Sequence, residues 1–143
     1  MRTRYETDFY GWTQEQARLL RSGQLSELDT QNLLEEIEAM GRSELRELVN
    51  RLKVLLINLL KWEHQPGFRG GSWLLTIEEQ RNQVEDIIGD SPGLKPKLPK
   101  ALQDAYRNAI VVAGRETGLP RSTFSGKCPW TFEQIINPDF YPD

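Results

Sequence analysis

Cysteine and histidine, the residues that most often supply metal ligands and nucleophiles, are nearly missing from this sequence. The chain contains one cysteine, Cys128, and one histidine, His64. A single cysteine excludes an internal disulfide, and a cysteine 64 positions from the only histidine has no zinc-ligand spacing. Since Cys128 precedes a proline and only His64 is available to activate it, we interpret it as a packed side chain rather than a nucleophile. The sequence therefore predicts no metal site and no cofactor.

Long apolar runs and an excess of positive charge are also missing. No run of about 18 apolar residues is present, so no membrane span is expected. The net charge is −3 with acids and bases interleaved, which does not favour a nucleic-acid partner. Neither a glycine-rich phosphate loop nor a Gly-x-Ser-x-Gly elbow occurs. The first residues lead into no apolar signal region, and with the single cysteine this favours a reducing cytoplasm.

Strict alternation of apolar and polar residues is absent, so we predict an all-α fold without a significant strand. Helical periodicity is strong instead, and it centres on residues 29–64. Apolar residues recur there at spacings of three and four, notably Leu34, Leu45, Leu48, Leu52, Leu55 and Leu59. A continuous helix over this range would be roughly 54 Å long at 1.5 Å per residue. The other elements are expected to pack against it.

Weaker signals outline the remaining helices. The spacing of Thr13 and Gln16 predicts a capping box that opens a short helix ending near Gly23. Further helices are expected at 73–88 and 98–118, separated by short breaks that suit antiparallel neighbours. Residues 119–143 form a tail rich in proline and aromatics, in which Thr131 with Gln134 indicates one more helical turn. We predict a single domain, 1–143: a small antiparallel helical bundle with this tail packed on its long central helix.

The first half of the long helix raises two open questions. Gly41 lies on the apolar stripe, where either a neighbouring element approaches closely or one helix ends and Ser43 caps the next. A helix folding back from the Pro66 turn would leave this half uncovered. The short helix that ends near Gly23, the helix at 98–118, the tail or a second copy of the chain must then bury Leu34, Ile37 and Leu45, so a homodimer is one expectation.

Short phrases along the whole chain resemble one bacterial family. The segments that carry the likeness are Asp8-Phe9-Tyr10, Leu33-Leu34-Glu35-Glu36-Ile37-Glu38, Leu59-Leu60-Lys61-Trp62, Ser72-Trp73, Glu116-Thr117-Gly118-Leu119 and Cys128-Pro129-Trp130. They resemble the family catalogued as domain of unknown function twenty-nine. The resemblance implies a compact helical bundle with no assigned activity. Two positions depart from the family pattern: Asn58 stands where histidine is common, and Ser125 where proline is usual. An activity that needed that histidine would be lost here.

Glu35 and Glu38 are the first candidate site residues. Two carboxylates three positions apart on a helix can share a divalent cation or divide acid and base roles. The simpler interpretation is structural, because Glu38 flanks the apolar stripe and Arg42 lies one turn later, in place for an ion pair. Both interpretations stay open at this point.

The second candidate site lies near the end of the long helix, beside the Gly70-Gly71 turn. Its residues are Asn58, Lys61, Trp62, Trp73 and Arg81, with His64 nearby. The tryptophans could line a small binding groove with an arginine over a ring, or simply pack the end of the bundle. Positive side chains near a helix C-terminus are favoured by the helix dipole and need no catalytic explanation.

Two functions follow from these patterns. The leading hypothesis is a non-enzymatic helical domain that acts through protein contacts, with an unknown partner or with itself along the long helix. The alternative is a divalent-metal-dependent hydrolase or nuclease that uses Glu35 and Glu38. The sequence leaves open whether the protein is an enzyme.

Overall fold

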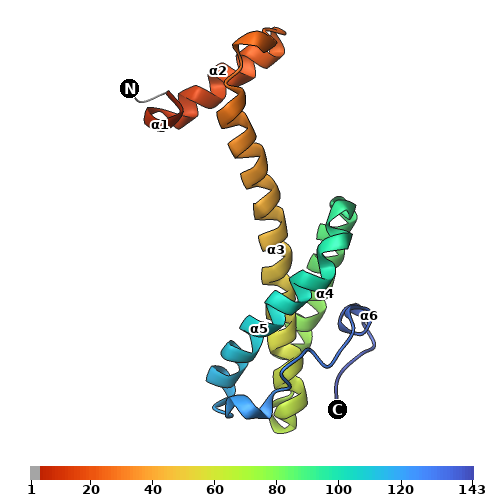
Figure 1. Cartoon of the computed structure of the whole chain (residues 1–143). Coiled ribbons are helices and arrows are strands. Elements are labelled where there is room, and N and C mark those ends of the chain that lie inside the picture. The colour runs from red at the N-terminus through yellow and green to blue at the C-terminus, as the bar shows by residue number, and fades with distance from the viewer. Residues whose placement is uncertain (1–3) are drawn as a thin grey trace. The chain divides into compact units, whose positions relative to one another are not determined.

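The computed structural model describes residues 4–143, and Figure 1 shows their arrangement in helices. In chain order the α-helices are α1 (Arg4–Thr7), α2 (Phe9–Arg21), α3 (Thr30–His64), α4 (Gly71–Asp90), α5 (Leu98–Thr117) and α6 (Phe132–Ile136). Short 3₁₀ turns join them: η1 (Leu25–Glu27), η2 (Pro66–Phe68), η3 (Pro92–Lys97) and η4 (Arg121–Thr123). No strand occurs within residues 4–143, so the all-α prediction is confirmed. The chain divides into two compact units, Met1–Arg42 and Ser43–Asp143, which are described separately.

The first unit is organised by the start of α2. The Asp8 carboxylate caps this helix by accepting a hydrogen bond from the backbone N–H of Gly11 at 3.0 Å. A Cβ at Gly11 would lie 2.1 Å from the other oxygen of the same carboxylate, so only glycine leaves room for this cap. The predicted capping box at Thr13 is wrong, because Asp8 starts the helix one turn earlier. Gln16 is buried instead, and its Oε1 accepts a hydrogen bond from the backbone N–H of Asp29 at 2.8 Å.

The prediction of one long helix is confirmed, and α3 is helical throughout, including Gly41. The interpretation that Gly41 ends one helix is wrong, because Ser43 lies inside α3 rather than at a cap. A Cβ at Gly41 would meet no atom of the described residues within 4 Å, so no neighbouring element of the same chain makes the predicted close approach.

The second unit has its core on the later turns of α3. Seven apolar side chains of α3 are buried there: Leu48, Leu52, Leu55, Leu56, Ile57, Leu59 and Leu60. They pack against Ile77 and Val84 of α4 and against the small residues of α5, which include Ala105 and Ala109. Small side chains let helix backbones approach closely, and alternate well with leucine in a packed core. The predicted bundle built on a long helix is therefore confirmed.

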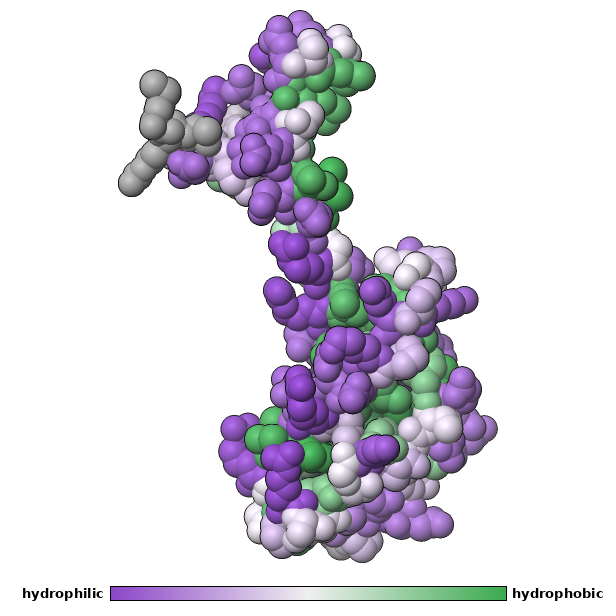
Figure 2. Space-filling view, viewed as in Figure 1, coloured by the Kyte–Doolittle hydropathy of each residue, from purple (hydrophilic) through white to green (hydrophobic). Residues whose placement is uncertain are grey.

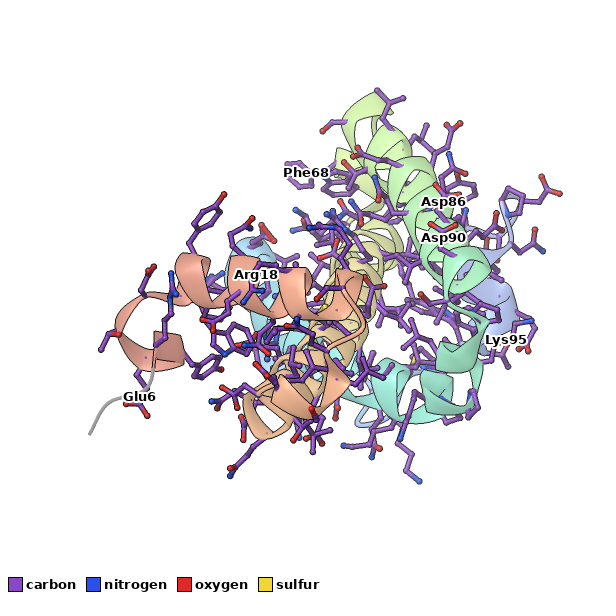
Figure 3. The ribbon with its side chains drawn as sticks, turned by 90° about the horizontal axis from the view of Figure 1, so that it is seen from above. Glu6, Arg18, Phe68, Asp86, Asp90 and Lys95 are labelled. Atoms are coloured by element: carbon purple, nitrogen blue, oxygen red, sulfur yellow. The ribbon has the colours of Figure 1, made fainter. Side chains whose placement is uncertain are left out.

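The connections between helices in this unit lie at the breaks that the sequence predicted between its helical segments. α4 continues to Asp90, and η3, which carries Lys95, turns the chain into α5 (Figure 3). α5 ends at Gly118, whose φ of 72° is the left-handed conformation that glycine adopts without strain.

The aromatic tail packs on the bundle as predicted. Thr131 and Gln134 form the predicted capping box at the start of α6. Ile135 of this helix is fully buried, and Phe124 and Trp130 are buried in the same core. The ring of Tyr141 lies 5.2 Å from that of Trp62 on α3. The tail thus completes the second unit rather than trailing from it.

Candidate functional site

One face of the first turns of α3 is apolar and exposed. Leu34, Ile37 and Met40 recur at every third position and are 57%, 59% and 61% exposed. In Figure 2 hydrophobic side chains gather on one side of this unit. Within the first unit, α1, α2 and η1 leave Leu34 and Ile37 exposed, whereas Leu45 packs on the core of the second unit. We call Leu34, Ile37 and Met40 the α3 stripe.

The helices before α3 pack on a different side of it. The Trp12 indole N–H donates to Asp29 at 2.9 Å, and the Tyr5 hydroxyl donates to Glu36 at 2.5 Å. At about 100° per residue, Asp29 and Glu36 lie roughly 80–100° from Ile37 on one edge of α3. The α3 stripe is therefore left open by the two helices that could have covered it.

Two ionisable groups in this packing are perturbed. The hydrogen bond to Glu36 is the main reason that the pKa of Tyr5 is raised to about 12. The pKa of Asp29 is lowered, first by the hydrogen bond from the Asn32 side chain and then by that from Trp12. Both shifts report on how α1 and α2 are held against α3.

Glu35 and Glu38 are both exposed on α3. The predicted structural ion pair of Glu38 with Arg42 is wrong, because both residues are exposed and no ion pair joins them. One turn of α3 does not supply a third metal ligand to the carboxylates of Glu35 and Glu38. Among residues 4–143, no group of three or more histidine, cysteine, aspartate or glutamate side chains is placed to hold a metal ion.

The second predicted site separates into several packing contacts. Asn58 donates through Nδ2 to the carbonyl of Val54 at 2.8 Å, within its own helix. Lys61 lies 3.7 Å from a carboxylate oxygen of Glu116 and 5.2 Å from the ring centre of Trp73. Asn58, which departs from the pattern that the sequence resembles, thus hydrogen-bonds to the backbone of its own helix.

Trp62 is packed between the turn after α3 and the tail. The guanidinium of Arg69 lies 5.0 Å from its ring centre, and Arg69 Nε also donates to the Trp62 carbonyl at 2.7 Å. The Tyr141 ring of the tail also contacts the Trp62 ring. The predicted cation–π contact with a tryptophan therefore exists, but Arg69 rather than Arg81 makes it. His64 lies beside Phe124, with ring centres 5.1 Å apart, and its Nε2 is 2.9 Å from Glu63.

Arg81 instead holds the C-terminal tail. Its side chain is 3% exposed, and it donates from Nε to the Ile135 carbonyl at 2.7 Å and from Nη2 to the Phe140 carbonyl at 2.6 Å. The guanidinium also lies 5.1 Å from the ring centre of Tyr141. No carboxylate within residues 4–143 pairs with it, and its buried Nη1 has no hydrogen-bond acceptor there. Burial lowers the pKa of this arginine, and the Tyr141 side chain and the charge of Asp139 act against that lowering. The two backbone carbonyls and the Tyr141 ring are the direct contacts of the guanidinium.

Sequence reasoning missed a pocket in the second unit. It has a volume of about 520 Å³ and lies between α5 and the segment that follows η4. Its walls are Pro99, Leu102, Gln103, Tyr106, Arg107, Ile110, Arg121, Gly126, Lys127, Cys128 and Trp130. The Tyr106 hydroxyl donates to the Ser125 carbonyl at 2.6 Å and fixes the segment across the helix. The run 117–132 contains two basic residues and no acidic one, which is the sequence signal that was overlooked.

Neither the Tyr106 hydroxyl nor the Cys128 thiol on the pocket wall is activated as a nucleophile. Burial raises the pKa of the Tyr106 hydroxyl to about 12 and also raises that of the Cys128 thiol. A thiol with a raised pKa carries little thiolate at neutral pH and is a weak nucleophile. The prediction that Cys128 is a packed side chain agrees with its partial burial in the core.

Comparison with known proteins agrees with the resemblance seen in the sequence. No helix among residues 4–143 combines the length and apolarity that crossing a membrane requires. No curated protein and no solved structure matches the chain. A family match extends over residues 4–141, nearly the whole chain, and its description is Domain of unknown function DUF29. The chain therefore belongs to the DUF29 family.

Proposed function

We propose that this protein is a helical assembly module that pairs with a second copy of itself through the α3 stripe. The observation that carries the proposal is the exposure of Leu34, Ile37 and Met40 at helical spacing. Three large apolar side chains in one row, each more than half exposed, are typical of a helix that is buried in an oligomer.

The charges beside the stripe favour an antiparallel pair. At about 100° per residue, Glu38 lies roughly 100° from Ile37, on the edge of the stripe away from α1 and α2, and Arg42 lies roughly 140° from Ile37 on the same side. A two-fold axis between antiparallel helices places the same edge of each helix against its equivalent. Glu38 of one copy then lies on the same side of the pair as the long side chain of Arg42 of the other. Gly41, which has open space around it, allows the two helices to approach closely there.

The expected strength is moderate. Fully burying a leucine, isoleucine or methionine contributes about 1.5–3 kcal/mol, and these side chains begin slightly more than half exposed. The six side chains of a pair therefore contribute about 5–10 kcal/mol, which is comparable with the cost of association. We expect a dimer that forms with rising concentration rather than one that is permanent.

Cross-linking tests this geometry. Single cysteines are introduced as Met40→Cys or Leu34→Cys in a chain that also carries Cys128→Ser, and a short bis-maleimide is added. If the axis lies near residues 39–40, beside Gly41, two copies of position 40 are within roughly 3 Å along the helix, and two copies of position 34 are roughly 15–18 Å apart. We expect cross-linked dimer from position 40 and much less from position 34.

Two other results would count against the proposal. Equal cross-linking at both positions would contradict an antiparallel axis near residues 39–40, and no cross-linking at either would indicate that α3 does not self-associate. A charge exchange provides a second check. Glu38→Arg should weaken the dimer because it faces Arg42 of the partner copy with a like charge, and adding Arg42→Glu should restore it.

The structure offers no specific support for the alternative, a metal-dependent hydrolase that uses Glu35 and Glu38. Both carboxylates are exposed on one helix, and the described residues place no third histidine, cysteine or carboxylate ligand beside them. We therefore assign Glu38 to the edge of the proposed interface and Glu35 to the side of α3 away from it.

A further inference from the structure

The pocket between α5 and residues 121–130 has an uneven charge. Three of its wall residues are basic, namely Arg107, Arg121 and Lys127, and none is acidic. This is unexpected in a chain whose net charge is −3. All three residues are exposed, so their charged groups are available to a ligand at the mouth of the pocket.

The nearest acid does not neutralise this group. Asp104 lies one turn before Arg107, with 3.8 Å between its carboxylate and the guanidinium. The same carboxylate also pairs with Lys100 at 3.3 Å, so its charge is already shared with a base outside the pocket. Within residues 4–143 neither Arg121 nor Lys127 has an acidic partner at all. The pocket mouth therefore carries a positive charge that the protein itself leaves uncompensated.

The interior of the pocket is apolar and aromatic. Leu102 and Ile110 of α5 face Trp130 across it, and Tyr106 contributes a ring whose hydroxyl is already used in the hydrogen bond to Ser125. A volume of about 520 Å³ lies in the range that holds small organic ligands. Because the basic side chains are exposed and the apolar ones are recessed, a bound molecule would place an anionic group outward and an apolar body inward.

From this arrangement we propose that the pocket binds a small organic anion, with a carboxylate or phosphate group held by Arg107, Arg121 and Lys127 and an apolar or aromatic body against Leu102 and Ile110. Arginine and lysine recognise both kinds of anionic group through charge-assisted hydrogen bonds. This activity is independent of the proposed pairing through α3, since none of the pocket residues lies on that helix.

Four probes separate the contributions of the head group and the body. Isothermal titration calorimetry is run with phenyl phosphate, phenylacetate, inorganic phosphate and phenol. We expect at least one of the two aromatic anions to bind at least tenfold more tightly than both inorganic phosphate and phenol. The stronger of phenyl phosphate and phenylacetate identifies the preferred head group. Failure of both aromatic anions to bind better than phenol and inorganic phosphate would overturn the proposal.

A charge-reversal pair tests the residues. Arg121→Glu with Lys127→Glu should weaken binding of the preferred anion by at least tenfold. The matched control is Lys95→Glu with Arg115→Glu, which changes the net charge equally at exposed residues outside the pocket wall. Equal weakening in both double variants would mean that the anion responds only to overall charge, and would contradict the proposed site.

Cys128 supplies an independent readout because it lies on the pocket wall. The preferred anion should slow alkylation of the Cys128 thiol by N-ethylmaleimide in the natural chain, and should have no effect in the Arg121→Glu, Lys127→Glu variant. An alkylation rate that is unchanged in the natural chain at a saturating anion concentration would place the anion elsewhere. Circular dichroism melting of each variant confirms that the comparison is made between folded proteins.

Discussion

Replacing Arg81 by methionine should release the C-terminal tail from the bundle. Arg81→Met keeps most of the apolar volume of the side chain but removes the charge and both hydrogen bonds to the carbonyls of Ile135 and Phe140. It also removes the contact with the Tyr141 ring. Each of these partners belongs to residues 135–141, so the whole effect should fall on the tail.

The expected size of the effect follows from opposing contributions. Two hydrogen bonds from a charged donor contribute about 3–6 kcal/mol, and a cation–π contact about 1–2 kcal/mol when desolvated. Burial of a guanidinium without a carboxylate partner costs several kcal/mol, which the substitution recovers. Since one buried and one partly buried carbonyl lose their donor, we expect a net loss of about 2–3 kcal/mol.

Urea unfolding and limited proteolysis measure the two parts of this prediction. The free energy of unfolding should fall by about 2–3 kcal/mol, and chymotrypsin should cut at the tail aromatics faster than in the natural chain. Arg115→Met is the matched control, because Arg115 is exposed on α5 and has no ion-pair partner among residues 4–143. A loss below about 0.5 kcal/mol with an unchanged cleavage pattern would refute the role given to Arg81.

Two further predictions concern the two units separately. The lowered pKa of Asp29 means that its carboxylate stabilises the packing of α2 above its ordinary pKa of 3.8, and that this contribution is lost as the pH falls through the lower folded-state value. Asp29→Asn should therefore shift the indole N–H resonance of Trp12. It should also destabilise this packing relative to the natural chain at about pH 6, and less so at about pH 3. An equal destabilisation at both pH values would contradict the linkage. Leu48→Asp should unfold the second unit, because it places a charge at a fully buried core position, whereas Leu75→Asp at a 68% exposed position should not. A soluble Leu48→Asp variant with natural helicity by circular dichroism would mean that the core is placed wrongly.

Local patterns account for what the sequence predicted correctly. The helices follow from apolar residues at spacings of three and four, and the Thr131–Gln134 capping box is correct because no stronger cap precedes it. The identical spacing at Thr13 misled, because Asp8 lies one turn earlier beside a glycine that leaves room for its carboxylate.

Contacts between distant segments account for what could not be predicted. The two acceptors of Arg81 lie 54 and 59 positions further along the chain, and no local pattern indicates them. The basic pocket is likewise formed only when residues 121–130 fold over α5. By contrast, the exposed α3 stripe could be inferred in part, because the length of the helix exceeded what the neighbouring helix could cover.

The measurement that tests the central claim most directly is the mass in solution by light scattering over a concentration series. The account predicts that the mass rises from that of one chain, 16.5 kDa, towards twice that value as the concentration increases. Ile37→Glu should keep the mass at that of one chain, while Leu75→Glu, an equally exposed apolar position on α4, should behave as the natural chain does. A single-chain mass at every concentration, or a dimer that Ile37→Glu leaves intact, would contradict self-association through the α3 stripe.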